Sequence, residues 1–308
     1  MLYIWILFNV FALAMLALDL WARRRPAASE RSRDAAIRTA FWVGIALAFA
    51  GVVFFWQGRQ VAVEFVTGYV VELSLSVDNL FIFLVVFQYF AVPEEQQQRV
   101  LTWGIVGALL MRGLFIVAGV GLVRRFHWIF YGLGALLVYS GIKLGFAGQP
   151  KVDPTNNPAV KALRRLIPVT ADYHGGSFFV RSRQGSPGLS ATPLLVVLAV
   201  IETTDLLFAV DSIPAVLAIT LNAFIVYASN LFAILGLRSL FFAVSSLMKT
   251  FRHLHAGLAL LLVLMGLKMI AEDHCKVSTL AMLGVVAAIL AASIGASLVR
   301  SGRKTHVP

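Results

Sequence analysis

The sequence predicts an all-α polytopic membrane protein with about nine transmembrane helices, six of which form two inverted three-helix repeats. Three observations lead there: an excess of apolar residues, apolar runs of membrane-spanning length, and an internal repeat. Of the 308 residues, 59% are hydrophobic and 13% are charged, whereas soluble chains carry about 45–50% apolar and about 25% charged residues. This excess favours a chain that crosses a bilayer over one with a large soluble core.

Runs of about 20 apolar residues between polar breaks define the expected helices. The first run is followed by arginines and has no basic leader, which favours a retained helix over a cleaved signal peptide. In chain order the runs cover residues 2–21, 39–57, 65–90, 100–123, 128–148, 192–218, 221–247, 254–271 and 277–299.

The basic residues predict the orientation of the chain. Most lysines and arginines fall in the loops of one side, namely 22–38, 91–99, 149–190, 248–253 and the C-terminal tail. The other side holds only Arg59, Arg124, Arg125 and Lys276. By the positive-inside rule, the N-terminus is expected outside and the C-terminus in the cytoplasm, in the plasma (inner) membrane. Topology accounts for the net charge of +11, so no nucleic-acid partner is expected, although contacts with anionic lipid are compatible with it.

Three pairs of segments repeat in the same order. "VELSLSVDN" pairs with "TDLLFAVDS", "LLMRGLFIVAG" with "LGLRSLFFAVS", and "GLGALLVYSGIK" with "GLALLLVLMGLK", each aligned on a charged residue. Because each unit would hold three helices, the second is expected to be inverted, as in many secondary transporters with a midplane site. Convergent Leu, Phe and Gly composition is the alternative. The expected divisions are 1–63, 64–148 (first repeat), 149–190 (cytoplasmic loop), 191–271 (second repeat) and 272–308.

Five acidic residues lie well inside the expected spans: Glu72, Asp78, Glu202, Asp205 and Asp211. Each costs about 2.5–3.5 kcal/mol at the centre of a membrane helix, so such groups are expected to be paired, hydrated or bound to metal. Arg112 and Arg238 can pair with some of them, but two guanidinium groups cannot neutralise five carboxylates. Lys143 and Lys268 lie near span ends, where their amines are expected to reach the membrane surface. A divalent cation or protons would balance the remaining charge.

The spacing of these acids adds detail. Glu202 and Asp205 are three residues apart and share a helix face. Asp211 lies six residues after Asp205, about 120° around an ideal helix, and Asp78 has the same place in the first unit. Pro214 would break the helix near Asp211 and free backbone oxygens beside it. Neutral polar groups occur nearby in the sequence at Asn79, Ser212, Ser229 and Asn230.

This oxygen-rich set favours Mg²⁺, Ca²⁺ or Mn²⁺ over Zn²⁺ or copper. The six histidines all fall in loops or at span ends, and the single cysteine, Cys275, excludes an internal disulfide and a multi-cysteine metal site. No tightly bound organic cofactor is expected. Since no Ser/His/Asp grouping, HExxH or glycine-rich phosphate loop is present, the sequence does not predict an enzyme.

Several segments resemble the tellurium resistance protein C (TerC) family, including its alkali-inducible Alx branch. They are "VELSLSVDNLFIF", "ETTDLLFAVDSIPAVLAIT", "SNLFAILGLRSLFF", "HGGSFFVRSRQG" and "GLKM". The resemblance implies export of Mn²⁺ from the cytoplasm, with links to alkaline pH, tellurite resistance and metal supply to exported enzymes. Thr203 and Thr204 stand where related sequences often have an apolar residue and then Ser or Thr. The resemblance places the family's acidic site on Glu72, Asp78, Asn79, Glu202, Asp205 and Asp211.

The leading hypothesis is a secondary transporter that exports Mn²⁺ by alternating access, with Ca²⁺ and Mg²⁺ as further candidate cations and protons as exchange partners. Its predicted metal site comprises Glu72, Asp78, Asn79, Glu202, Asp205, Asp211, Ser212 and Asn230, with Arg112 and Arg238 as ion-pair support. A non-transporting scaffold that aids metal loading of exported proteins, or tellurite and stress resistance, is the alternative. An organic-cation exporter would need an aromatic-lined pocket, whereas aromatic residues are spread over all spans. No oligomeric state is predicted.

The long loop 149–190 holds two further expected elements. "AVKALRRLIPV" predicts a short amphipathic helix on the membrane surface. "SFFVRSRQGSPGLSATP" predicts a short strand pair or an irregular cap, punctuated by Gly and Pro. A linker role and a gating role both stay open.

Overall fold

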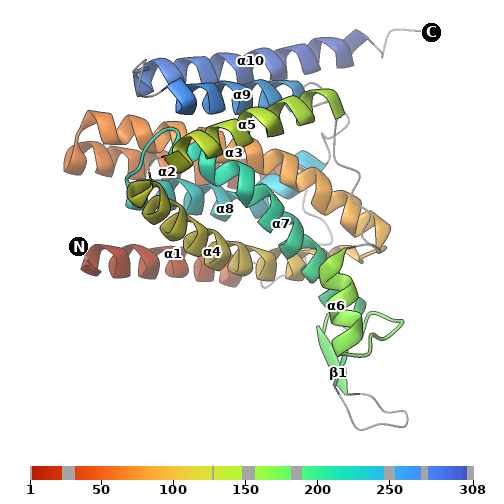
Figure 1. Cartoon of the computed structure of the whole chain (residues 1–308). Coiled ribbons are helices and arrows are strands. Elements are labelled where there is room, and N and C mark those ends of the chain that lie inside the picture. Colours follow the sequence, from red (N-terminus) through yellow and green to blue (C-terminus); the bar gives the residue numbers. More distant parts are fainter. Residues whose placement is uncertain are drawn as a thin grey trace.

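The computed structural model describes residues 2–22, 32–126, 128–147, 157–181, 189–245, 254–271 and 277–303. Its elements are helices and one small strand pair (Figure 1). In chain order these are α1 (Leu2–Ala22), α2 (Ser32–Gln57), α3 (Arg59–Tyr89), α4 (Glu94–Arg125), α5 (Trp128–Ala147), α6 (Pro158–Leu166), β1 (Phe179–Arg181), β2 (Leu189–Ala191), α7 (Pro193–Leu217), α8 (Ala223–Ser245), α9 (Leu254–Ala271) and α10 (Thr279–Arg303).

The helices confirm a multi-pass, essentially all-α membrane protein. Within the described ranges, 6 helices are long and apolar enough to cross a bilayer: α2, α3, α4, α5, α7 and α10. Three shorter apolar stretches lie in α1, α8 and α9, each inside a predicted span. The predicted first unit corresponds to α3–α5 and the predicted second unit to α7–α9.

Helices α3 and α4 are longer than their apolar runs predicted, with 31 and 32 residues. At about 1.5 Å per residue, both exceed the roughly 30 Å hydrocarbon core. Their polar ends account for the difference, since hydropathy detects only the apolar part. In α4 the first turn carries Glu94 and Glu95 and the last turn carries Arg124 and Arg125. Both pairs oppose the partial charges at the helix ends and stabilise them.

The helices of the two predicted units pack across one another. Helix α3 packs against α8, α4 against α7, and α5 against α9. Helix α2 lies on α3 and α8, while α10 lies on α9 and α3. In Figure 1, α5, α9 and α10 stack together, and α1 lies on the opposite side of the bundle.

Helices α5 and α9 approach so closely that their backbones touch. A Cβ atom on Gly266 would lie 2.5 Å from the carbonyl oxygen of Gly134. A Cβ atom on Gly141 would lie 2.7 Å from the carbonyl oxygen of Ala259. Small residues let membrane helices pack by close van der Waals contact, which matters in lipid because apolar burial drives association less there.

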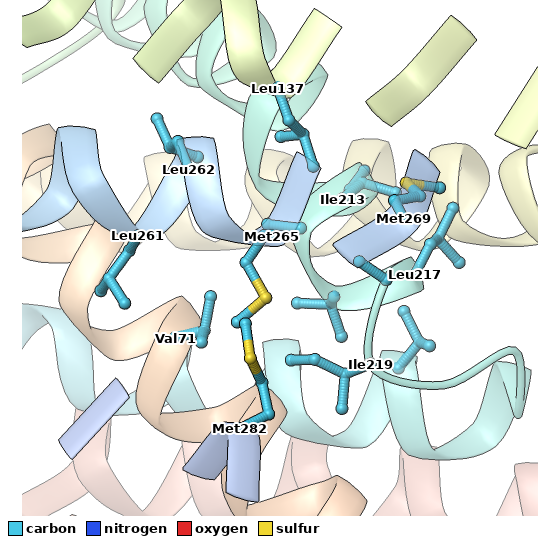
Figure 2. Packing of buried hydrophobic residues seen from close by; sticks show 14 of the residues in the cluster. Val71, Leu137, Ile213, Leu217, Ile219, Leu261, Leu262, Met265, Met269 and Met282 are labelled. Atoms are coloured by element: carbon cyan, nitrogen blue, oxygen red, sulfur yellow. The ribbon is translucent and has the colours of Figure 1, made fainter. Parts of the chain in front are cut away.

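A buried apolar cluster joins several helices. It includes Val71 of α3, Ile213 of α7, Met265 of α9 and Met282 of α10. Figure 2 shows Met265 and Met282 pointing toward one another between these helices. Methionine has flexible, polarisable side chains that fill irregular gaps, so this cluster fixes α7 against α9 and α10.

Residues 157–181 and 189–192 form a small module at one end of the bundle, which we call the cap. Helix α6 confirms the predicted short helix, and β1 and β2 confirm the strand pair, antiparallel with Val180 opposite Ser190. The apolar face of α6 packs on the protein: Val160 is buried in a cluster with residues of α3, α4 and α7. In Figure 1, α6 and β1 project beyond the membrane-spanning helices.

Two hydrogen bonds hold the cap on the α3–α4 turn. The Tyr173 hydroxyl donates to the carbonyl of Phe90 at 2.7 Å, and Arg99 Nη1 donates to the carbonyl of Gly176 at 2.8 Å. Gly176 has φ of 80°, a left-handed conformation that glycine adopts without steric penalty. The cap therefore links the α3–α4 turn to the start of α7.

Candidate intramembrane charge site

The centre of the site is Arg112 of α4, whose guanidinium bridges two carboxylates. Its Nη1 donates to Glu72 Oε2 at 2.8 Å. Its Nε and Nη2 donate to Asp205 Oδ2 and Oδ1 at 3.2 and 3.1 Å, a bidentate pair. Arg112 is only 2% exposed, so these charge-assisted bonds offset the desolvation of the guanidinium.

Three helices supply this cluster. Glu72 and Asn79 come from α3, Arg112 from α4, and Asp205 from α7. Asn79 Nδ2 donates to Asp205 Oδ1 at 3.4 Å, which is a second link between α3 and α7. Asp205 therefore accepts hydrogen bonds from two helices of the first unit, and the ion pair spans the boundary between the units.

Glu202 lies one helical turn before Asp205, and no basic side chain that the structure describes pairs with it. Its Oε2 is buried and has no hydrogen-bond partner among the described residues. Its carboxylate rests on the bare backbone of α4, because a Cβ atom on Gly107 would lie only 2.1 Å from Oε1. Gly107 is thus a site residue that sequence reasoning missed; it leaves room for the carboxylate.

A narrow cavity adjoins these groups. Its polar lining comes from Ser76, Arg112, Glu202 and Asp205, and the rest is mainly apolar residues of α3, α4, α7 and α8. A buried carboxylate oxygen without a donor is costly. The cavity therefore offers a polar spot where a cation, a proton or water could satisfy Glu202.

In the described part of the chain, the Asp211 side chain binds outside the Arg112 cluster. It accepts a hydrogen bond of 2.6 Å from the Ser140 hydroxyl of α5, and Lys143 supplies an attractive charge nearby. Ser140 was missed by the sequence analysis; its only signal was a lone hydroxyl one turn before Lys143. Pro214 lies inside α7 and removes the N–H that would bond the Val210 carbonyl, so a backbone acceptor is freed beside Asp211.

The neutral polar residues that the sequence singled out differ in whether their side chains are hydrogen-bonded. Ser229 donates to the carbonyl of Val226 at 3.1 Å, one turn back in its own helix. The Ser212 hydroxyl and Asn230 Nδ2 are buried and unsatisfied within the part of the chain that the structure describes. Each such group costs free energy until it finds a partner.

Lys268 is buried against protein, whereas the sequence predicted that its amine would extend to the membrane surface. It is 9% exposed and donates a hydrogen bond to the carbonyl of Ala218, the residue that caps α7. A cation at a helix C-terminus is stabilised by the partial negative charge there. Lys143 is exposed, and its reach to the membrane surface stays a prediction.

Asp78 and Arg238 lie in α3 and α8, and their side chains fall outside what the structure describes. Among the described side chains, no three His, Cys, Asp or Glu groups lie close enough to hold a metal ion. The predicted metal site therefore stays a prediction. In the described arrangement Arg112 binds Glu72 and Asp205, and Glu202 lines the cavity beside them, so these three acids face one described base.

A bundle of apolar helices with a buried charge cluster between them defines an integral, multi-pass membrane protein. The chain belongs to the Integral membrane protein TerC family, whose profile matches residues 57–305.

Its relatives are membrane proteins by name. The chain is 42% identical over 305 residues to "Uncharacterized membrane protein STKORF319" of Myxococcus xanthus, covering 99% of this chain and 94% of the relative. It is 41% identical over 297 residues to "Putative membrane-bound redox modulator Alx" of Escherichia coli (strain K12), covering 93% and 91%. It is 45% identical over 260 residues to "Thylakoid membrane protein TERC, chloroplastic" of Arabidopsis thaliana, covering 84% and 67%. No solved structure matches the chain.

Proposed function

We propose that this protein is a secondary transporter that exports a divalent metal cation from the cytoplasm, with Mn²⁺ as the first candidate and Ca²⁺ and Mg²⁺ as further ones. The observation that carries the proposal is the excess of buried acids over Arg112 at the boundary between the two units. Glu72 and Asp205 share one guanidinium, and Glu202, which lines the same cavity, has an oxygen with no hydrogen-bond partner among the described residues. Carboxylate and neutral oxygen groups are ligands that such cations prefer.

The proposed transporter has two inverted repeats, α3–α5 and α7–α9. The packing of the helices supports this: α3 packs on α8, and α4 packs on α7. Because α3 corresponds to α7 and α4 corresponds to α8, exchange of the two units converts the α3–α8 pair into the α7–α4 pair. Inverted repeats that meet at a central site are common in secondary transporters.

The crossing of α5 and α9 gives independent support for the repeat. The sequence alignment of the units pairs Gly134 with Ala259 and Gly141 with Gly266. In the structure, Gly134 contacts Gly266, and Gly141 contacts Ala259. When each residue is replaced by its counterpart in the other unit, the first contact becomes the second. This is the pattern expected of an internal two-fold axis between α5 and α9.

We propose nine spans, with the shorter apolar helices α1, α8 and α9 added to those of full length. The N-terminus then lies outside and the C-terminus lies in the cytoplasm of the plasma membrane, with the cap on the cytoplasmic side. The proposed orientation rests on the distribution of lysine and arginine over the loops.

The proposed metal ligands are carried by both units. Asp78 and Asp211 would bind the cation together with acids of the Arg112 cluster, and Asn79, Ser212 and Asn230 would add neutral groups. Proton exchange fits a carboxylate site, because a carboxylate that loses its metal inside a membrane gains from binding a proton.

One observation favours a second candidate, a non-transporting membrane scaffold. Arg112 satisfies both Glu72 and Asp205, as a structural ion pair would. A scaffold of this kind would assist metal loading or stress resistance without moving ions. The Alx relatives are named for redox modulation; in this chain a disulfide within the 308 residues is excluded, because Cys275 is the only cysteine.

Flux into proteoliposomes separates the two candidates. The purified protein is reconstituted with a metal-sensitive dye in the lumen, and Mn²⁺, Ca²⁺ and Mg²⁺ are added outside at two pH values. The transporter predicts uptake of Mn²⁺ above that of protein-free liposomes, with a change in luminal pH if protons are exchanged. Absence of uptake for every metal at both pH values would contradict transport and support the scaffold.

A further inference from the structure

Arg112 is placed where it must respond to any relative movement of the two units. Its guanidinium binds Glu72 of the first unit and Asp205 of the second at the same time. The bidentate geometry on Asp205 uses both carboxylate oxygens. A divalent cation that binds Asp205 therefore competes with this guanidinium for the same two oxygens.

Glu202 is a second acidic group near the Arg112 guanidinium. Arg112, Asp205 and Glu202 line the same cavity. Glu202 Oε2 is buried without a hydrogen-bond partner in the described part of the chain. Glu202 and Asp205 are three residues apart on α7, so their side chains are neighbours on one face of that helix.

We propose that Arg112 is a tethered counter-cation, which occupies Asp205 and Glu72 when no metal is bound and moves to Glu202 when a divalent cation arrives. This inference rests on the proposed transport function and deepens it. The guanidinium keeps the acids neutralised in the empty protein and is displaced by the cargo. Arg112 thus sets the affinity of the site and lets the cation leave again.

A tethered competitor and a merely nearby positive charge predict different results for a lysine at this position. Lysine keeps the charge but loses the planar fork that grips both oxygens of Asp205. If Arg112 acts only through its charge, Arg112→Lys leaves the affinity for Mn²⁺ unchanged. If Arg112 competes for the oxygens, Arg112→Lys tightens Mn²⁺ binding, and Arg112→Gln tightens it further.

The test is Mn²⁺ binding to purified protein in nanodiscs, together with Mn²⁺ exchange in proteoliposomes. We expect the Kd of Arg112→Gln to fall more than about tenfold, since apparent affinity is reduced by the fraction of sites that a competitor occupies. We expect Arg112→Lys to lie between this variant and the wild type. Exchange should slow in both variants, because the cation is no longer pushed off by the returning guanidinium.

The matched control is Arg124→Gln, which removes the same charge from the same helix. Arg124 lies at the end of α4, where it donates to the carbonyl of Leu221 at 2.8 Å, so its Kd should equal that of the wild type. If Arg112→Gln does not fold, the Kd of Arg112→Lys for Mn²⁺ decides the test. A Kd for Arg112→Lys equal to or weaker than that of the wild type overturns the proposal.

This result is distinguishable from a failure of the proposed function. If the wild type moves no divalent cation in proteoliposomes, transport is contradicted and the inference falls with it. If the wild type transports Mn²⁺ but the Arg112 variants bind it no more tightly, the transporter stands and only the role of Arg112 is rejected.

Discussion

Arg112 of α4 and Asp205 of α7 form a buried bidentate ion pair, with Nε–Oδ2 and Nη2–Oδ1 distances of 3.2 and 3.1 Å. The two residues are 93 positions apart in the chain and belong to different predicted repeats. The pair therefore fastens the two units together at the place where the buried acids gather.

Breaking this pair from one side should destabilise the protein. Asp205→Asn leaves the guanidinium without its second carboxylate, and removal of one partner of a buried pair costs about 3–5 kcal/mol. The double variant Asp205→Asn with Arg112→Gln should lose less than the sum of the two single losses. Unfolding free energies measured in mixed micelles check this; additive losses would contradict a direct pair.

Gly107→Ala should displace the carboxylate of Glu202. The new Cβ would lie 2.1 Å from Oε1, but a glutamate side chain is flexible and can swing away. We therefore expect stability to change by less than about 1 kcal/mol, while Mn²⁺ flux falls several-fold. The matched control on the same helix is Gly121→Ala, since a Cβ atom at Gly121 has no neighbour within 4 Å. Equal flux in both variants would show that the position of Glu202 is unimportant.

Gly266→Ala should destabilise the α5–α9 crossing. Its Cβ would meet the carbonyl oxygen of Gly134 at 2.5 Å and the backbone nitrogen of Val138 at 2.8 Å. Because backbone atoms cannot move aside as a side-chain tip can, we expect a loss of about 1–3 kcal/mol. Gly284→Ala in α10, where nothing lies within 4 Å, is the control. Thermal unfolding in detergent compares the two, and unchanged stability for Gly266→Ala would rule out a tight crossing.

The cap should loosen at high pH through Tyr173. Burial raises the pKa of the Tyr173 phenol above its usual value. A raised folded-state pKa contributes stability below the unfolded pKa of about 10 and loses it as pH rises through the folded pKa. The protection factors of the amides of residues 157–181, which correct for the base-catalysed rise in intrinsic exchange, should therefore fall above about pH 10. Tyr173→Phe has no hydroxyl to donate to Phe90, so its exchange should be faster at neutral pH. This variant should not lose further protection at alkaline pH. The same alkaline step in Tyr173→Phe would assign it to another group.

The sequence was sufficient to predict features that depend on local composition. Apolar runs identified the helices, and the loop residues predicted the short helix and strand pair of the cap. Buried acids in apolar runs also indicated ion pairing with Arg112, because an isolated charge in a membrane is costly. Sharing of Arg112 between Glu72 and Asp205 was not predictable, since it depends on how α3, α4 and α7 pack.

The residues that sequence reasoning missed act through neighbouring helices. Gly107 matters only because Glu202 of α7 rests on it, and Ser140 matters only because Asp211 faces α5. Lys268 was misjudged for the same reason: its place near a span end suggested the membrane surface, but the C-terminal end of α7 covers it. Such contacts are set by tertiary packing, on which local sequence patterns carry no information.

The most direct test of the central claim, that acids from both units bind a divalent cation inside the membrane, is Mn²⁺ flux through proteoliposomes containing Asp78→Asn or Asp211→Asn. Asparagine is nearly isosteric with aspartate, so both variants should elute as folded, monodisperse protein, and size-exclusion chromatography checks this before flux is measured. The account predicts that each abolishes Mn²⁺ flux while Arg124→Gln leaves it at the wild-type level. Wild-type flux in the Asp78→Asn and Asp211→Asn proteins would contradict it.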